Sequence, residues 1–372
     1  MMPIPSKGAE RAGVPPTKAH PNPFQKSPPY KGKDRAAVID LGTNNCRLLI
    51  AERAKRASPW PTRGAFRVVD SFSRIVRLGE GLGKTDTLDP AAIDRTIAAL
   101  KICARKIEQS GARRIRAVAT QACRQAHNGS DFVERVERET GIRLKTITPM
   151  QETRLGVSST LPLLNRRWPH ALIFDVGGGS TEVSFLGFKK GRGFQILDSL
   201  STPLGVVSIA EAYSTQAEDL SPQVYQKMQA LARDAFGEFA NRNGIPALQK
   251  DRQVQTVGMS GTVTTVKALS LGLKTYRRAL VDQTLFHTDQ IADIRDDLIA
   301  RGYEGLTAHG CIGRERADLV LPGVAILEGL VETFKFKQLL VLDRGLREGL
   351  LNELFKSPRK KRNLARKATQ GK

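Results

Sequence analysis

The stretch that most limits how this chain folds is residues 171–186, which read ALIFDVGGGSTEVSFL. Its first half is an apolar run that ends at Asp175, as a buried strand would. Its second half alternates apolar with polar residues from Thr181 onward. Three glycines, Gly177, Gly178 and Gly179, join the two halves. The stretch therefore predicts a β-hairpin whose tip carries no Cβ atoms.

A tip of this kind is suited to bind an anion. Backbone N–H groups without neighbouring Cβ atoms approach a phosphate closely, and Ser180 and Thr181 add hydroxyl donors. Asp175 and Glu182 place carboxylates beside the tip. A carboxylate next to a phosphate requires a divalent cation between the like charges. Taken alone, the three glycines are also compatible with a loose turn that binds nothing.

A second stretch, residues 36–52 or AAVIDLGTNNCRLLIAE, repeats this plan. An apolar strand ends at Asp40, a turn with Gly42, Thr43 and Asn44 follows, and a second strand returns. The aspartates of the two stretches lie 135 positions apart. Such an internal duplication predicts two like domains that face each other across a phosphate-binding cleft.

Three further segments place polar groups next to predicted strand or helix ends. Ser260 and Gly261 precede a helix that begins at Thr262, and a helix N-terminus binds anions. Arg124 follows a predicted strand, where it is either a surface charge or a phosphate clamp. Glu152 lies in the first turn of a predicted helix, where an acidic residue is favourable even without a catalytic role.

Length and charge set the broad class. With 372 residues, 40% of them hydrophobic, the chain is long enough for two domains, and its formal net charge is +22. Residues 1–35 hold seven Lys or Arg against two acidic residues, and residues 357–372 hold seven against none. We expect both ends to be disordered basic tails, the first of them proline-rich. The charge of the remaining body favours a polyanionic partner, and contact of the tails with nucleic acid stays open.

The cysteines and histidines argue against a zinc site. The four cysteines show no CxxC pairing, and the five histidines show no metal-ligand spacing. Isolated thiols predict a reduced, cytoplasmic protein. No apolar run is long enough to predict a membrane span.

Seven motifs in matching order resemble the exopolyphosphatase / guanosine pentaphosphate phosphohydrolase (Ppx/GppA) family. They are AVIDLGTNN, TQACRQAHNG, QETRL, FDVGGGSTE, GMSGTVTTV, LPGVAIL and DRGLREG, and they extend from about residue 36 to residue 355. The resemblance implies an α/β fold of two ribonuclease H-like domains of the actin-like ATPase superfamily, with an interdomain cleft. We expect residues 36–155 to form the N-terminal domain and residues 156–356 the C-terminal domain, as in the short form of the family.

The resemblance also implies an activity and the residues that perform it. The activity is hydrolysis of terminal phosphoanhydride bonds in inorganic polyphosphate, guanosine pentaphosphate or both, with a role in the stringent response. Glu152 matches the glutamate that activates the attacking water, and Asp40, Asp175 and Glu182 match the carboxylates around a Mg²⁺ ion. The matching phosphate contacts are Thr43, Asn44, Arg124, Gly177, Gly178, Gly179 and Ser180; the residue patterns above add Gly42, Thr181, Ser260, Gly261 and Thr262.

Two positions depart from the family pattern. Gln151 stands where the family usually has the first glutamate of a Glu-Glu pair, which removes a negative charge beside the expected base. Asn45 replaces a serine, so an amide stands where a hydroxyl is usual.

Two other function classes stay open. One is an ATP-dependent kinase or ATPase on the same fold, because phosphate loops do not name the acceptor; the Glu152 segment argues against it. The other is a non-catalytic protein that binds RNA or another polyanion through its basic tails, which would need none of the carboxylates. The sequence leaves the oligomeric state, including a homodimer, open.

Overall fold

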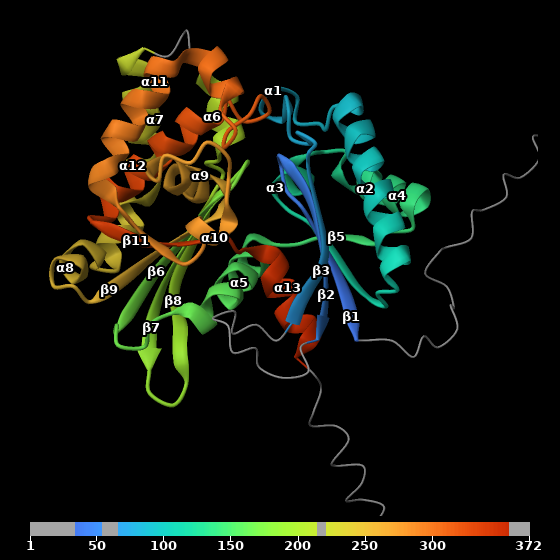
Figure 1. The fold of residues 1–372 in the computed structure, drawn as a ribbon, viewed down its shortest axis with the longest axis horizontal. Coiled ribbons are helices and arrows are strands. Elements are labelled where there is room, and N and C mark those ends of the chain that lie inside the picture. The colour runs from blue at the N-terminus through green and yellow to red at the C-terminus, as the bar shows by residue number, and fades with distance from the viewer. Residues whose placement is uncertain (1–33, 54–65, 214–220, 357–372) are drawn as a thin grey trace, which may run out of the picture.

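The computed structural model describes residues 34–53, 66–213 and 221–356. They form two lobes, each built on one mixed sheet with helices packed against it (Figure 1). The predicted tails fall almost wholly outside the described residues. Arg35, which the sequence places at the end of the first tail, already belongs to strand β1.

The first lobe has a five-stranded sheet in the order β3-β2-β1-β4-β5. Strands β1 (Arg35–Leu41), β2 (Asn45–Arg53) and β3 (Phe66–Ile75) form an antiparallel meander. Strands β4 (Arg114–Ala119) and β5 (Leu144–Thr146) continue the sheet in parallel beside β1. The helices of this lobe are α1 (Leu82–Thr85), α2 (Pro90–Ser110), α3 (Gln121–Gln125) and α4 (Gly129–Thr140).

The second lobe repeats this topology in a six-stranded sheet of order β10-β11-β9-β6-β7-β8. The meander is β6 (His170–Val176), β7 (Thr181–Lys189) and β8 (Gly193–Thr202). Strands β9 (Val254–Met259) and β11 (Gln338–Leu342) are the parallel additions, and β10 (Thr284–His287) pairs antiparallel with β11. The duplicated hairpins of the sequence are therefore β1–β2 and β6–β7.

The second lobe also carries the larger set of helices. These are α6 (Val206–Tyr213), α7 (Pro222–Arg242), α8 (Ile245–Lys250), α9 (Ser260–Ser270), α10 (Arg278–Val281), α11 (Ile291–Ala308) and α12 (Val320–Phe334), with 3-10 turns at Leu161–Leu163 and Thr288–Gln290.

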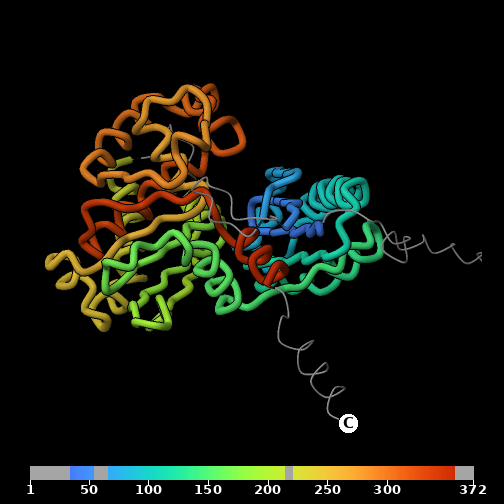
Figure 2. Tube along the Cα trace, turned by 60° about the horizontal axis from the view of Figure 1, so that its bottom comes forward, coloured from blue at the N-terminus to red at the C-terminus, as the bar shows by residue number. Residues whose placement is uncertain are grey.

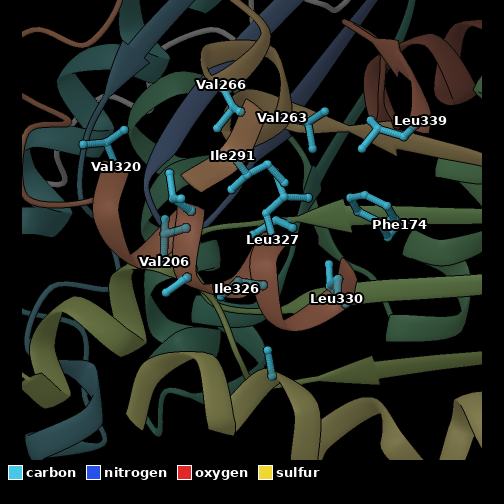
Figure 3. Packing of buried hydrophobic residues seen from close by; sticks show 14 of the residues in the cluster. Phe174, Val206, Val263, Val266, Ile291, Val320, Ile326, Leu327, Leu330 and Leu339 are labelled. Carbon is cyan, nitrogen blue, oxygen red and sulfur yellow. The ribbon is translucent and has the colours of Figure 1, made fainter. Parts of the chain in front are cut away.

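The core of the second lobe lies between its sheet and helices α9 and α12. Figure 3 shows Phe174 of β6 beside Leu327 and Leu330 of α12 and Val263 of α9. All four side chains are almost completely buried. Burial of such a side chain contributes roughly 1.5–3 kcal/mol, so this cluster holds the sheet and the two helices in one rigid unit.

Two helices, α5 (Pro149–Thr160) and α13 (Leu346–Phe355), lie between the lobes (Figure 1). Leu350 and Leu351 of α13 pack with Val38 of β1, so the C-terminal helix returns to the first sheet, as the chain trace also shows (Figure 2). The sequence assigned this helix to the second domain and placed the domain boundary at residue 155, inside α5. Chain order alone hides this return, because the apolar face of α13 is covered by residues some three hundred positions away.

Among the described residues, no helix is both long and apolar enough to span a membrane.

Candidate active site

The tips of the two duplicated hairpins have the same backbone geometry. The Gly42 N–H donates to the Asn45 carbonyl at 2.9 Å, and the Gly177 N–H donates to the Ser180 carbonyl at 2.9 Å. Both turns therefore close over four residues directly after an aspartate-bearing strand.

The two tips touch each other across the cleft. A Cβ atom built on Gly179 would lie 2.4 Å from Thr43 Oγ1, and one on Gly178 would lie 3.2 Å from the Asn44 Cβ. Any side chain at these glycines would push the tips apart. The glycines are thus required by close approach of the lobes as well as by access to an anion.

Helix α6 holds the glycine loop, residues 177–179 at the tip of the β6–β7 hairpin. The backbone N–H groups of Val206 and Val207 donate to the carbonyls of Gly177 and Gly178 at 3.0 and 2.8 Å. These bonds use the first amides of α6, which would otherwise lack partners. They hold the loop in one conformation before any ligand arrives.

Strand register places charged side chains next to the two aspartates. Asp40 is paired with Arg47 between β1 and β2, and Asp175 is paired with Glu182 between β6 and β7. The sequence prediction did not include Arg47, since an arginine in a strand usually faces solvent. The signal was available: Arg47 precedes Glu182 by the same 135 positions that separate the aspartates.

Glu152 enters the cleft from the N-terminal turn of α5. Thr148 caps this helix: its side chain accepts from the Gln151 N–H at 3.2 Å, and the Gln151 side chain accepts from the Thr148 N–H at 3.0 Å. This capping box fixes the first turn. Gln151, a departure from the family pattern, serves the box as well as a glutamate would.

Arg124 holds Glu152 in place. Its Nη1 donates to Glu152 Oε2 and to the Ile147 carbonyl, both at 2.8 Å, and its Nη2 donates to Gln121 Oε1 at 2.9 Å. The sequence predicts Arg124 as a phosphate contact. The structure places it behind Glu152, outside the residues that line the cleft.

The four carboxyl groups at the cleft all have raised pKa values, and burial is the largest cause for each. The pKa of Glu152 is raised to about 8, with repulsion from Glu182 as the second cause, against the attraction of Arg124. The pKa of Asp175 is raised to about 7, again with repulsion from Glu182. Burial also raises the pKa values of Asp40 and Glu182. Four carboxyl groups so placed favour a cation or protons among them.

Three arginines that the sequence prediction did not include also line the cleft: Arg316, Arg344 and Arg347. Arg344 Nε is buried and has no hydrogen-bond partner among the described residues. A buried donor without a partner is costly, so this guanidinium is suited to an anionic ligand. Arg344 and Arg347 belong to the DRGLREG motif, which was the available signal.

The N-terminus of α9 adds backbone donors to the same cleft. Ser260 takes a left-handed conformation with φ of 79° and its hydroxyl donates to the Val176 carbonyl at 2.8 Å. This bond ties the start of α9 to the end of β6, beside the glycine loop. Gly261 faces Arg47 of the other lobe, whose Nη2 would lie 3.9 Å from a Cβ built on the glycine.

The cleft brings together almost all of the predicted site residues. Those that line it are Asp40, Gly42, Thr43, Asn44, Glu152, Asp175, Gly177, Gly178, Gly179, Ser180, Glu182, Ser260, Gly261 and Thr262. Besides Arg124, the exception is Thr181, which is fully buried and donates its hydroxyl to the Leu204 carbonyl at 2.6 Å. Thr181 thus secures the chain after β8, and its hydroxyl is used inside the lobe.

The donor set suits a hard cation such as Mg²⁺ only in part. Asp40, Asp175 and Glu182 offer carboxylate oxygens, and Asn44 Oδ1 is buried without a hydrogen-bond partner among the described residues. No group of three or more acidic, histidine or cysteine side chains is close enough within the described ranges to hold a metal by itself. Mg²⁺ commonly uses one or two carboxylates together with substrate phosphates, so the residues fit an ion that arrives with its substrate.

Comparison with known proteins agrees with this arrangement. The model of the Ppx/GppA phosphatase family matches residues 61–357. Exopolyphosphatase 2 of Mycobacterium tuberculosis is 28% identical over 328 residues, which cover 85% of this chain and 97% of the relative. The Aquifex aeolicus Ppx/GppA enzyme is 29% identical with a TM-score of 0.68, covering 86% of this chain and 99% of that chain.

An exopolyphosphatase from Cytophaga hutchinsonii, at 21% identity, has the same fold, with a TM-score of 0.74 over 86% of this chain and 97% of its own. The predicted α/β fold, with two sheet-based lobes on either side of a cleft, is confirmed. Taken with the match over residues 61–357 and the paired hairpin tips, these similarities identify the family: the chain belongs to the Ppx/GppA phosphatases.

Proposed function

We propose that the protein hydrolyses the terminal phosphoanhydride bond of inorganic polyphosphate, guanosine pentaphosphate or both, with Glu152 as the general base. The observation that carries the proposal is the position of Glu152. It is a carboxyl group with a raised pKa, fixed by a capping box and by Arg124, and it lines the same cleft as both hairpin tips. A base with a pKa near the working pH is the most effective kind.

The reaction needs a water, a base and positive groups around the transferred phosphoryl group. The water gives a proton to Glu152 while its oxygen bonds to the terminal phosphorus. The bridging P–O bond then breaks, which yields orthophosphate and a shortened chain that keeps the bridging oxygen. Arg47, Arg344 and the tip amides would stabilise the negative charge on the phosphoryl oxygens, because fixed donors in a buried cleft act strongly on developing charge.

A Mg²⁺ ion, when bound, would supply further neutralisation of the phosphate charge. Asp40, Asp175 and Glu182 are the residues that would hold it. Their raised pKa values follow from burial and, for Asp175, repulsion by Glu182. A cation would remove part of this penalty. The four cysteines are free and buried, which supports the cytoplasm as the place of action.

The test is a phosphate-release assay that compares long-chain polyphosphate, guanosine pentaphosphate and ATP with Mg²⁺ and with a chelator. We expect release from at least one of the first two substrates, and loss of release with the chelator. Preference for ATP would contradict the proposal and favour an ATP-dependent kinase or ATPase.

A further inference from the structure

A second cavity lies on the other side of the contact between the two hairpin tips. Thr43 and Gly179 line both this cavity and the main cleft. The second cavity has a volume of about 320 Å³, whereas one water molecule needs roughly 10–15 Å³ of such space. The contact between Thr43 and Gly179 therefore lies between two spaces, each of which is lined by groups that an anion could contact.

The two spaces differ in charge. The main cleft is densely charged: four arginines line it, Arg47, Arg316, Arg344 and Arg347, together with the five carboxyl groups of Asp40, Glu152, Asp175, Glu182 and Asp343. The charged residues among the described lining of the second cavity are Lys84 and Glu211, which cancel. Its other polar groups include the side chains of Gln121, Gln125 and Ser208. Neutral donors of this kind bind phosphate weakly, whereas the arginines retain a polyanion.

The second cavity also adjoins the expected reaction centre. Arg124 donates to Glu152, which lines the main cleft, and to Gln121, which lines the second cavity. Thr120, the neighbour of Gln121, lines the main cleft. Consecutive residues, Thr120 and Gln121, thus line the two spaces at this point, as Thr43 alone does at the tips.

We propose that the second cavity is the exit route for orthophosphate, which passes between Thr43 and Gly179 when the two tips move apart, while the rest of the chain stays in the cleft that the arginines line. The proposal rests on the proposed function. An enzyme that shortens a bound chain from its end produces orthophosphate beyond that end. If the chain blocks the way back, a second opening lets the product leave first. Product release commonly limits enzyme turnover.

The test is to narrow the second cavity at a residue outside the catalytic and binding groups. Ala212 of α6 is exposed and lines the cavity, so Ala212→Trp fills it from the solvent side. The matched control is Ala91→Trp on α2, an exposed alanine that is outside both cavities. Both variants are assayed on long-chain polyphosphate and on tripolyphosphate, with free and acid-quenched orthophosphate measured separately.

We expect Ala212→Trp to slow steady-state turnover of long chains roughly tenfold, as slower product release would. Acid quenching should then reveal a burst of one bound orthophosphate per site. Tripolyphosphate should be turned over at the wild-type rate, because its short product leaves the cleft and opens it. Ala91→Trp should match wild type on both substrates.

Equal loss on both substrates, or no loss on either, would overturn the exit route. Weaker binding of long chains without a burst would also overturn it, since the cavity would then hold the chain itself. The wild-type protein, assayed on the same two substrates, tests whether the proposed activity exists at all. If it releases no phosphate from either substrate, the proposed function fails and not the exit route.

Discussion

The Gly349→Ala substitution should disturb the contact between the two helices that lie between the lobes. A Cβ atom at this position of α13 would lie 2.1 Å from the Leu155 carbonyl oxygen and 2.7 Å from its carbon. An ordinary carbon–oxygen contact is about 3.3 Å, so one helix must move by roughly 1.2 Å. The obstacle is backbone, which does not rotate away as a side chain would.

Two opposing terms set the magnitude. Alanine in place of glycine inside a helix is worth about 1 kcal/mol of stability, whereas an overpacked contact costs typically 1–3 kcal/mol. We expect a net loss of about 0–2 kcal/mol in the free energy of unfolding. Activity should fall more steeply. Leu155 lies one helical turn from Glu152, and displacement of a catalytic group by about 1 Å costs roughly 100-fold in rate.

The assay is chemical denaturation followed by circular dichroism, together with phosphate release at saturating substrate. Gly237→Ala on α7 is the control, since no atom lies within 4 Å of its added Cβ; it should be as stable as wild type or more so. If Gly349→Ala behaves like Gly237→Ala in both assays, the close packing of α5 on α13 is refuted.

Three further predictions follow from the cleft. The pKa values of Asp175 and Glu152 in the folded protein are about 7 and about 8, so between about pH 5 and pH 8 these groups keep protons that the unfolded chain releases. The free energy of unfolding should therefore fall as pH rises through this range. In thermal melts, Mg²⁺ should stabilise the protein more at pH 8 than at pH 5. Arg124→Gln should lower kcat and shift the rise in rate to higher pH, with little change in KM. A raised KM with an unchanged pH–rate profile would instead make Arg124 a phosphate ligand. Asp175→Asn should raise the Mg²⁺ concentration needed for half-maximal rate; an unchanged requirement in a Mg²⁺ titration would remove it from the metal site.

Local chemistry made much of the fold predictable from the sequence. Asp89 followed by Pro90 predicts a helix start, and the Asp89 side chain does accept from the Ala92 N–H at 3.0 Å. The duplicated hairpins likewise predict the repeated meanders, because their strands pair with neighbours in the sequence.

Features set by distant contacts were not predictable in this way. Ser130 has the chemistry of a helix N-cap, but the N-cap of α4 is Asn128, two residues earlier, and the helix begins at Gly129. The Asn128 side chain pairs with the backbone of Leu88 at 2.8 and 3.0 Å, and this long-range contact fixes the start. The return of α13 to the first lobe has the same kind of cause.

The candidate active site likewise combines residues that local sequence predicts with contacts that depend on distant parts of the chain. Residues on the hairpin tips could be found from their motif, whereas the partners of Arg124 depend on how α3 meets α5. From sequence alone, an arginine near a phosphate site is equally compatible with two roles: a phosphate ligand, or a residue that positions the catalytic base. The 2.8 Å contact between Arg124 Nη1 and Glu152 Oε2 favours the second role.

The most direct test of the central claim is phosphate release by Glu152→Gln, with substrate binding measured on the same protein and Gln151→Ala as the control. The amide keeps the shape of the carboxylate but accepts no proton, so turnover should fall by about 10²- to 10⁴-fold while binding of the phosphate chain is largely retained. Gln151→Ala removes the side chain that accepts from the Thr148 N–H and should cost far less turnover, because that residue only caps the helix. Near-normal turnover by Glu152→Gln would mean that another group takes the proton, and Glu152 would not be the base.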